Sequence, residues 1–290
     1  MEELQQLPIP LLLWYREHAR VLPWRSDPTA YHVWISEIML QQTRVAAVLD
    51  YYRRFLEAAP TVADLAAMPQ EQLMKLWQGL GYYSRARNLH KAAVQIMERH
   101  GGVFPNTYED IRSLAGVGDY TAGAISSIAF HLPIPAVDGN VLRVSARICG
   151  DEGDISPPAM KKKVARALAE VIPLDAPGDF NQAMMELGAC LCLPRNPRCN
   201  LCPVQGACRA FALGLERALP VRGARRKQLE VNRDVYMISD GGRVLLRRRP
   251  DEGLLRGMWE FPGEEEDTGF LAGFTVLARE KHTSKEASYI

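Results

Sequence analysis

The chain has 290 residues and a formal net charge of +1, with 47% hydrophobic and 24% charged residues. This length accommodates one or two domains with apolar cores, and the composition is typical of a globular protein. The first residues are acidic, and the apolar run at residues 11–13 is far too short for a signal-peptide core or a membrane span. We therefore expect no membrane association and a cytoplasmic protein.

Residues 1–218 predict a mainly helical body, because apolar residues recur there at three- and four-residue spacing and Gly or Pro turns separate the segments. Asn106-Thr107 and Ser156-Pro157-Pro158 have the composition of helix starts, a capping side chain or an early proline. The helical segments that we expect are residues 34–57, 61–67, 70–79, 84–100, 120–131 and 158–171.

The sequence changes character near residue 220. Residues 219–230 form a basic linker. Residues 235–238 and 244–246, separated by an Asp240-Gly241-Gly242 turn, predict two strands, and residues 258–263 predict another strand that ends in a turn. We therefore expect a short α+β segment over residues 231–290, behind the helical body.

A glutamate stands in an apolar helical segment near the start of the chain. Glu37 has Ile35, Ile38 and Met39 as neighbours. Such neighbours remove water from a carboxyl group and favour its protonated form. The alternative is a glutamate on the exposed side of the helix.

Two glycines precede the segment predicted at residues 120–131. Gly116 and Gly118 bracket one apolar residue, so the backbone can turn tightly and expose consecutive N–H groups at the helix start. This arrangement suits a phosphodiester held without base specificity. The alternative is a plain turn between two helices, with glycine required only by its geometry.

Asp138 begins an Asp-Gly-Asn sequence, which by itself predicts an ordinary turn or a helix N-cap. If a helix begins here, its N-terminus favours the ionised form of Asp138. Together with Glu37, the pattern is one carboxyl placed to be neutral and another placed to be charged. That division suits cleavage of a glycosidic bond, where one group protonates the leaving group and the other stabilises an oxocarbenium-like centre.

Four cysteines are grouped at positions 192, 199, 202 and 208, with six, two and five residues between them. The short Cys199-x-x-Cys202 step lets adjacent thiolates face one metal centre, and four thiolates suit a structural zinc or a [4Fe–4S] cluster equally well. Unrelated thiols or two disulfides are the remaining alternative. Cys149 and Cys190 lie outside the pattern, and we expect them to be small buried apolar residues.

These motifs, taken together, resemble a known family. The segments Leu114-Ala115-Gly116-Val117-Gly118, Val137-Asp138-Gly139-Asn140-Val141 and the four cysteines resemble the helix–hairpin–helix DNA glycosylases with an iron–sulfur cluster. Further segments narrow the resemblance to the adenine DNA glycosylase (MutY) family, and they are Leu22-Pro23-Trp24-Arg25, residues 36–43, residues 79–89 and residues 181–188. The resemblance spans residues 1–220.

The resemblance implies a mainly α, two-lobed fold. A six-helix barrel lobe with the helix–hairpin–helix would cover residues 25–132, and an iron–sulfur lobe would combine residues 1–24 and 133–218. It also implies that Cys192, Cys199, Cys202 and Cys208 hold a [4Fe–4S] cluster rather than zinc. Residues 235–263 resemble the start of a Nudix-like C-terminal domain.

The resemblance implies roles for individual residues as well. Glu37 would protonate adenine N7, Asp138 would hold the developing sugar cation, and Tyr120 and Asn140 would position Asp138 and the attacking water. Tyr120 stands where lyase relatives carry a lysine, so we expect a monofunctional enzyme. DNA and base contacts would come from Arg25 and Gln182 in the adenine pocket, Gln42, Thr43, Leu80 and Tyr82 around the opposite base, and Gly116 and Gly118 on the DNA backbone.

The resemblance therefore predicts a base-excision repair enzyme that acts as a monomer on double-stranded DNA. It would hydrolyse the N-glycosidic bond of adenine mispaired with 8-oxoguanine or guanine. The alternatives are a T·G or U·G mismatch glycosylase, an endonuclease III-like glycosylase, or a non-catalytic lesion-binding module.

The C-terminal segment departs from the family pattern. Gly269 stands where a Nudix hydrolase carries a glutamate, so we expect no pyrophosphohydrolase activity. His282-Thr283-Ser284 resembles a degenerate form of the loop that reads 8-oxoguanine. Because the segment is about half as long as the family's domain, we expect a weaker preference for 8-oxoguanine over guanine.

Overall fold

The computed structural model describes residues 2–223, 235–240, 242–250, 252–253 and 256–263. The chain divides into two compact units, residues 1–224 and 225–290. Among the described residues, no helix combines the length and apolar character that spanning a membrane requires.

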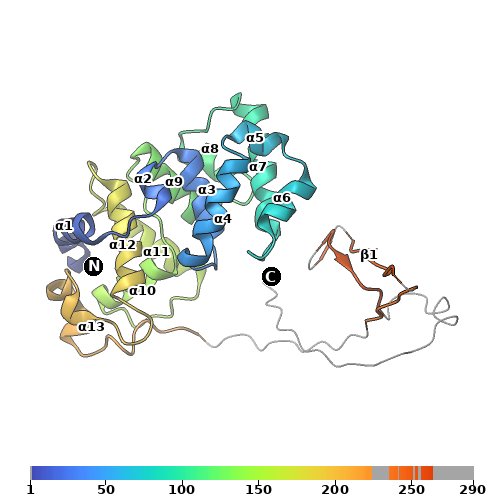
Figure 1. The fold of residues 1–290 in the computed structure, drawn as a ribbon. Coiled ribbons are helices and arrows are strands. Elements are labelled where there is room, and N and C mark those ends of the chain that lie inside the picture. Colours follow the sequence, from blue (N-terminus) through green and yellow to red (C-terminus); the bar gives the residue numbers. More distant parts are fainter. Residues whose placement is uncertain (1, 224–234, 241, 251, 254–255, 264–290) are drawn as a thin grey trace. The chain divides into compact units, whose positions relative to one another are not determined.

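The first unit is helical (Figure 1). Its α-helices are α1 (Pro8–His18), α2 (Pro23–Ser26), α3 (Ala30–Leu40), α4 (Val45–Ala58), α5 (Val62–Ala67), α6 (Gln70–Trp77), α7 (Ser84–His100), α8 (Tyr108–Ser113), α9 (Asp119–Phe130), α10 (Gly139–Cys149), α11 (Pro158–Ala169), α12 (Pro177–Cys190) and α13 (Arg209–Ala212). Short 3₁₀ helices are η1 (Glu2–Gln6), η2 (Cys199–Leu201) and η3 (Gln205–Ala207).

Two hydrophobic cores organise this unit. The first core draws on residues between Leu22 and Ala136, and α3 runs through it with nearly every side chain from Tyr31 to Met39 buried. A helix that is apolar on all sides is expected in a protein interior. The second core joins residues 4–15 to residues between Val137 and Val204, so the N-terminus packs with the later helices.

The two cores meet where α9 packs against both α3 and α12. Glycines make this approach possible. A Cβ placed on Gly123 would lie 2.5 Å from the carbonyl oxygen of Pro135, and one on Gly178 would lie 2.7 Å from that of Ser127. Asn181 on α12 joins the same elements, since its Oδ1 accepts from the Ala136 N–H at 3.0 Å and its Nδ2 donates to Ser127 Oγ at 2.8 Å.

The segment expected as one helix over residues 34–57 is two helices, and that prediction was wrong. The chain turns between α3 and α4 over residues 41–44, with Gln42 in the left-handed region at a φ of 59°. The apolar spacing continues across the break because Met39 and Val48 are both buried in the first core. The apolar periodicity of residues 34–57 therefore indicated that both helices pack in the same core, and not that they form one continuous helix.

The described part of the second unit contains one short antiparallel pair, β1 (Arg247–Arg248) with β2 (Trp259–Glu260). The strands expected at residues 235–238 and 244–246 are single bridges, Val235 with Gly263 and Ser239 with Val244. The regular pairing therefore begins just after the expected strand at residues 244–246, whereas β2 lies within the strand expected at residues 258–263. Most of the linker, together with Gly269 and His282-Thr283-Ser284, lies outside the described residues.

A first prediction concerns the junction of the two cores. Gly123→Ala forces its methyl group against the Pro135 carbonyl, which belongs to the backbone and cannot rotate away. Overpacking of this kind costs about 1–3 kcal/mol, and chemical denaturation should show that loss of unfolding free energy. Gly206→Ala is the matched control, because a Cβ there meets nothing within 4 Å; equal losses in both variants would contradict the close approach.

Candidate active site and cysteine cavity

A buried glutamate and a partly buried tyrosine form the centre of the site. Glu37 on α3 is 7% exposed, and its Oε2 accepts a hydrogen bond of 2.6 Å from the Tyr120 hydroxyl on α9. Burial raises the pKa of Glu37 to about 7, and the negative charge of Asp138 adds to this effect, while the hydrogen bond from Tyr120 opposes it. The expectation of a desolvated Glu37 is confirmed by its burial, and the raised pKa favours the protonated form.

Tyr120 is fixed as a hydrogen-bond donor. Its hydroxyl also lies 3.6 Å from the Met185 sulfur, in the region where the two cores meet. Burial raises the pKa of Tyr120 well above its usual value, and the nearby carboxyl groups of Glu37 and Asp138 act in the same direction. The phenol therefore keeps its proton, and its shorter hydrogen bond is the one that it donates to Glu37.

Asp138 is the N-cap of α10, which confirms that a helix begins at the Asp-Gly-Asn sequence. Its Oδ1 accepts from the Val141 N–H at 2.7 Å, and its Oδ2 accepts from Asn140 Nδ2 at 2.8 Å. We expected the helix start to favour the ionised form. Burial instead raises the pKa of Asp138, and the hydrogen bonds from Val141 and Asn140 offset this only in part.

A chain of hydrogen bonds extends from Asp138 toward the cysteines, and our sequence reasoning missed it. Arg143 Nη2 donates to Asn140 Oδ1 and to the Gly188 carbonyl, both at 2.8 Å, and its Nε donates to the Cys192 carbonyl at 2.8 Å. One pattern in the sequence could have indicated these hydrogen bonds. Asn140, Arg143 and Arg147 recur on one side of α10, whose side chains from residue 141 to 148 are all buried.

Arg25 belongs to an ion cluster that forms around a buried glutamate. Glu186 on α12 is 1% exposed, and its carboxylate accepts from Arg25 Nη2 at 2.8 Å and from Arg20 Nε at 2.6 Å. Burial by itself raises the pKa of Glu186, but the hydrogen bonds and charges of both arginines outweigh it and hold the pKa at about 2. Gln182, the other residue expected in a base pocket, lies one turn earlier on α12 and is half-buried.

The two-glycine turn lies between α8 and α9, as a hairpin of helices requires. Gly116 has a φ of 76°, and a Cβ there would lie 2.7 Å from Asn88 Cβ. Gly118 is the N-cap of α9. The long helix α7 supports the turn, because Gln95 Oε1 accepts from the Ala115 N–H at 2.8 Å. The N–H groups of the first α9 turn are thereby held in place.

The residues expected at the opposite base lie on two turns. Gln42 and Thr43 belong to residues 41–44, whereas Leu80 and Tyr82 belong to residues 78–83. Gln42 and Tyr82 both have left-handed backbones, with φ values of 59° and 49°, and Tyr82 is 38% exposed. Leu80 is buried, so little of its side chain is available to a ligand.

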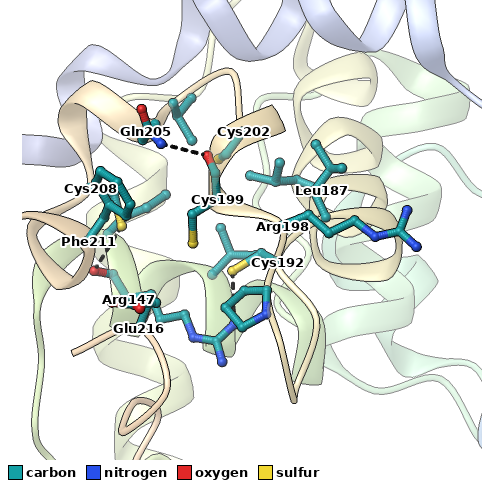
Figure 2. Close-up of a pocket in the computed structure, with 15 residues that line it drawn as sticks. Arg147, Leu187, Cys192, Arg198, Cys199, Cys202, Gln205, Cys208, Phe211 and Glu216 are labelled. Carbon is teal, nitrogen blue, oxygen red and sulfur yellow. Dashed lines mark hydrogen bonds between the residues drawn. The ribbon is translucent and has the colours of Figure 1, made fainter. Parts of the chain in front are cut away.

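Cys192, Cys199, Cys202 and Cys208 line one cavity in the second core (Figure 2). All six cysteines of the chain are free thiols, which argues against the disulfide alternative. Within the described residues, no three metal-ligating side chains are close enough for one metal ion. Four thiols around one cavity suit either a structural zinc or an iron–sulfur cluster.

The cavity wall is held by a buried arginine. Arg147 Nη1 donates to Cys192 Sγ at 3.3 Å and to the Leu193 carbonyl at 2.7 Å, and its Nε donates to the Leu219 carbonyl at 2.8 Å. The two cysteines outside the motif, Cys149 and Cys190, are half-buried rather than fully buried. Both pack against the second core.

Comparison with known proteins places the chain in context. Residues 35–173 match the HhH-GPD superfamily of base excision DNA repair proteins, and residues 234–287 match a NUDIX domain. The chain is 40% identical to the adenine DNA glycosylase of Mus musculus and 38% identical to that of Homo sapiens, with 87% of this chain covered in both cases. It spans 59% and 56% of the length of these relatives.

A bacterial relative is covered more fully. The chain is 34% identical to the adenine DNA glycosylase of Buchnera aphidicola over 87% of this chain and 72% of the relative. Among solved structures, a thermostable thymine-DNA glycosylase matches with a TM-score of 0.66 at 26% identity, covering 73% of this chain and 98% of the other. A non-covalent endonuclease III–DNA complex matches with a TM-score of 0.61 at 25% identity, with the same coverage.

A second prediction follows from the pKa of Glu37. The folded-state pKa is raised, so the stabilising neutral form is present below the ordinary pKa of 4.5 and is lost as the pH rises through about 7. A rise from 4.5 to about 7 corresponds to about 3 kcal/mol. Glu37→Gln should therefore gain stability over the native protein between pH 5 and about 8, measured by denaturant unfolding at each pH.

The exposed Glu71 provides the control for that measurement. Glu71→Gln has no desolvated carboxyl group to remove, so its stability difference from the native protein should stay flat across the same pH range. A flat difference for Glu37→Gln as well would show that Glu37 is hydrated in the folded protein.

Proposed function

Because the chain belongs to the adenine DNA glycosylase family of the HhH-GPD superfamily, we propose that it hydrolyses the N-glycosidic bond of adenine in double-stranded DNA. The proposed substrate is adenine mispaired with 8-oxoguanine or guanine, and the proposed working form is a monomer. The observation that carries this proposal is a pair of carboxyl groups, one buried and bonded to a phenol, the other half-buried and at a helix N-cap.

Glu37 would act as the general acid. Because Tyr120 donates to Oε2, the carboxyl proton belongs on Oε1, which is then free to donate to adenine N7. A pKa of about 7 keeps a substantial protonated fraction at neutral pH. Protonated adenine leaves as a neutral base, which removes the main barrier to cleavage of the bond.

Asp138 would stabilise the sugar as the base departs. The Val141 N–H and the Asn140 amide fix both of its oxygens, so the carboxylate cannot rotate away from a bound substrate. The cation that develops on the sugar supplies a nearby positive charge, which favours the ionised carboxylate in a buried site. Water would then add to the sugar, with Asn140 and Tyr120 bordering its path.

The chemistry of Tyr120 favours hydrolysis without strand cleavage. A β-lyase mechanism needs an amine that forms a Schiff base with the sugar. The position next to Glu37 carries a phenol, and its raised pKa makes it a poor nucleophile. We therefore propose a monofunctional glycosylase.

Other residues would bind the DNA. Arg25 would line the adenine pocket, held in place by Glu186, and Gln182 on the same face of α12 would offer an amide to the base edge. Gly116 and Gly118 would present the N–H groups of the first α9 turn to a phosphate. Gln42, Thr43, Leu80 and Tyr82 would border the position opposite the adenine.

We also propose that Cys192, Cys199, Cys202 and Cys208 hold a [4Fe–4S] cluster. The support is the shared cavity, its apolar surroundings and the membership of the chain in the adenine DNA glycosylase family, whose four-cysteine pattern it resembles. Such a cluster ties four points of one loop together and so shapes the loop. Arg147 and Arg143 fasten Cys192 to α10 through its sulfur and its carbonyl.

A second candidate is favoured by one observation. The thermostable thymine-DNA glycosylase and the endonuclease III complex have the same fold over 73% of this chain. A T·G or U·G mismatch glycosylase would share this scaffold. The identity of the released base separates the two candidates.

The third prediction tests the reaction itself. Incubation with duplexes containing A·8-oxoG, A·G, T·G or U·G, followed by alkaline cleavage of abasic sites, should show release of adenine only. Glu37→Gln should lower the single-turnover rate by about 10²–10⁴-fold, because it removes the general acid, and Asp138→Asn should lower it at least as much. Both variants should still bind DNA, and Glu71→Gln should excise adenine at the native rate.

Two outcomes would count against the assigned roles. Release of thymine or uracil would favour the second candidate function. A borohydride-trapped protein–DNA crosslink formed by the native protein would show a Schiff base and contradict the monofunctional reaction.

The fourth prediction concerns the cysteine cavity. The purified protein should be brown and contain about four iron and four sulfide per chain. Cys199→Ser should lose most of the iron, whereas Cys149→Ser should retain it, because Cys149 lies outside the cavity. A colourless native protein that contains one zinc would contradict the cluster.

A further inference from the structure

A buried arginine that the proposed reaction does not use lies at the start of α7. Arg85 is only 8% exposed, and the guanidinium lies 5.4 Å from the centre of the Trp77 ring and 5.5 Å from that of Tyr82. Burial lowers the pKa of Arg85 to about 10, so the group is still charged at neutral pH. A buried positive charge needs hydrogen-bond acceptors or negative charges close to it.

One nitrogen of the guanidinium closes the end of α3. Arg85 Nη1 donates to the carbonyls of Ile38, Met39 and Gln41 at 2.8, 3.0 and 2.7 Å. These carbonyls belong to the last turn of the helix, where no further helical N–H groups are available to them. A positive charge is favourable there because the C-terminal end of a helix carries a partial negative charge. The first of these acceptors directly follows Glu37.

The other nitrogen reaches a different part of the chain. Arg85 Nη2 donates to the carbonyls of Leu80 and Gly81 at 3.0 and 3.2 Å, and it lies 3.5 Å from Thr43 Oγ1. The two turns at residues 41–44 and 78–83 are about forty residues apart in the sequence, and they reach across to the same planar side chain. We call this pair of turns the twin turns.

The backbone conformation of the twin turns requires hydrogen bonds that hold it in place. Gln42 and Tyr82 hold left-handed backbones, which side chains other than glycine adopt only when the surroundings enforce them. Tyr82 at the same time presents a partly exposed aromatic ring. An exposed aromatic on a rigid turn is the kind of group that stacks on an unpaired base.

We propose that Arg85 is a positioning residue that locks the twin turns to each other and to the helix that carries Glu37. The proposal rests on the proposed function: the locked unit enters the duplex as one body while adenine moves toward Glu37. Arginine suits this role because its planar fork carries donors in two directions. A lysine ammonium keeps the charge but has a single donor atom, which cannot serve the α3 carbonyls and the 78–83 turn in the same way.

The test measures base extrusion separately from bond cleavage. 2-Aminopurine replaces the target adenine opposite 8-oxoguanine, and its stopped-flow fluorescence reports unstacking in a Glu37→Gln background. We expect Arg85→Lys and Arg85→Met to slow extrusion by about tenfold or more, while binding to the duplex changes by no more than about threefold. With Glu37 restored, excision should recover most of its loss when the adenine is supplied in an unpaired bulge, since extrusion there is already achieved.

Arg53→Met is the matched control. Arg53 is also an arginine of the first unit, but it is exposed on α4 and pairs with Asp50 and Glu57 at the surface. Its removal takes away the same charge without touching the twin turns, so extrusion should proceed at the rate of the background protein. Melting temperatures of all variants record any loss of folded protein.

The outcomes are decisive in each case. Extrusion at the background rate in Arg85→Lys would overturn the proposal, because charge alone would then suffice. Loss of extrusion only in proportion to loss of folded protein, or failure of both variants to fold, would overturn it in favour of a folding role. A native protein that extrudes 2-aminopurine but releases no adenine would refute the proposed function and leave the comparison of Arg85 variants intact.

Discussion

The close packing of α9 between α3 and α12 is the constraint on which the site depends. Gly123 and Gly178 allow backbone to approach backbone, and Asn181 ties the chain that crosses between the two cores. This junction places Tyr120 of α9 against Glu37 of α3. The same crossing segment leads directly into Asp138 at the start of α10, so both carboxyl groups are located by one contact between helices.

The buried charges of this unit are compensated in different ways. Glu186 is paired with two arginines, and its pKa falls to about 2. Glu37 has a phenol as its hydrogen-bond partner, and its pKa rises to about 7. Asp138 accepts from the Val141 N–H and from the Asn140 amide, which offset the effect of burial only in part and leave its pKa raised. A carboxyl group with full ionic compensation is suited to holding a structure, whereas a partly compensated one can exchange a proton or meet a new positive charge.

Backbone carbonyls compensate the buried arginines. Arg85 donates hydrogen bonds to carbonyls at the end of α3. Arg143 donates to a carbonyl of α12 and to that of Cys192, and Arg147 donates to a carbonyl just after Cys192. Each cation gathers segments that are distant in sequence, because one guanidinium carries five donors in a fixed plane. Hydrogen bonds therefore link the helix of Glu37 to the turns joined by Arg85, and link Asp138 through Asn140 and Arg143 to the cysteine loop.

The sequence by itself determined the helical body and the grouping of the four cysteines, and it indicated a desolvated Glu37 and a possible helix start at Asp138, because each depends on neighbours within a few residues. Tertiary structure alone decided the break after α3, the raised pKa of Asp138 and the partners of Arg85, Arg143 and Glu186. The break arises where two helices share one core, and Arg85 bonds to residues up to 47 positions away. Glu186 bonds to Arg20 across 166 positions. Apolar periodicity and local motifs record the environment along a helix, but the burial of a charge and the choice of its partner are set by segments that meet only when the chain folds.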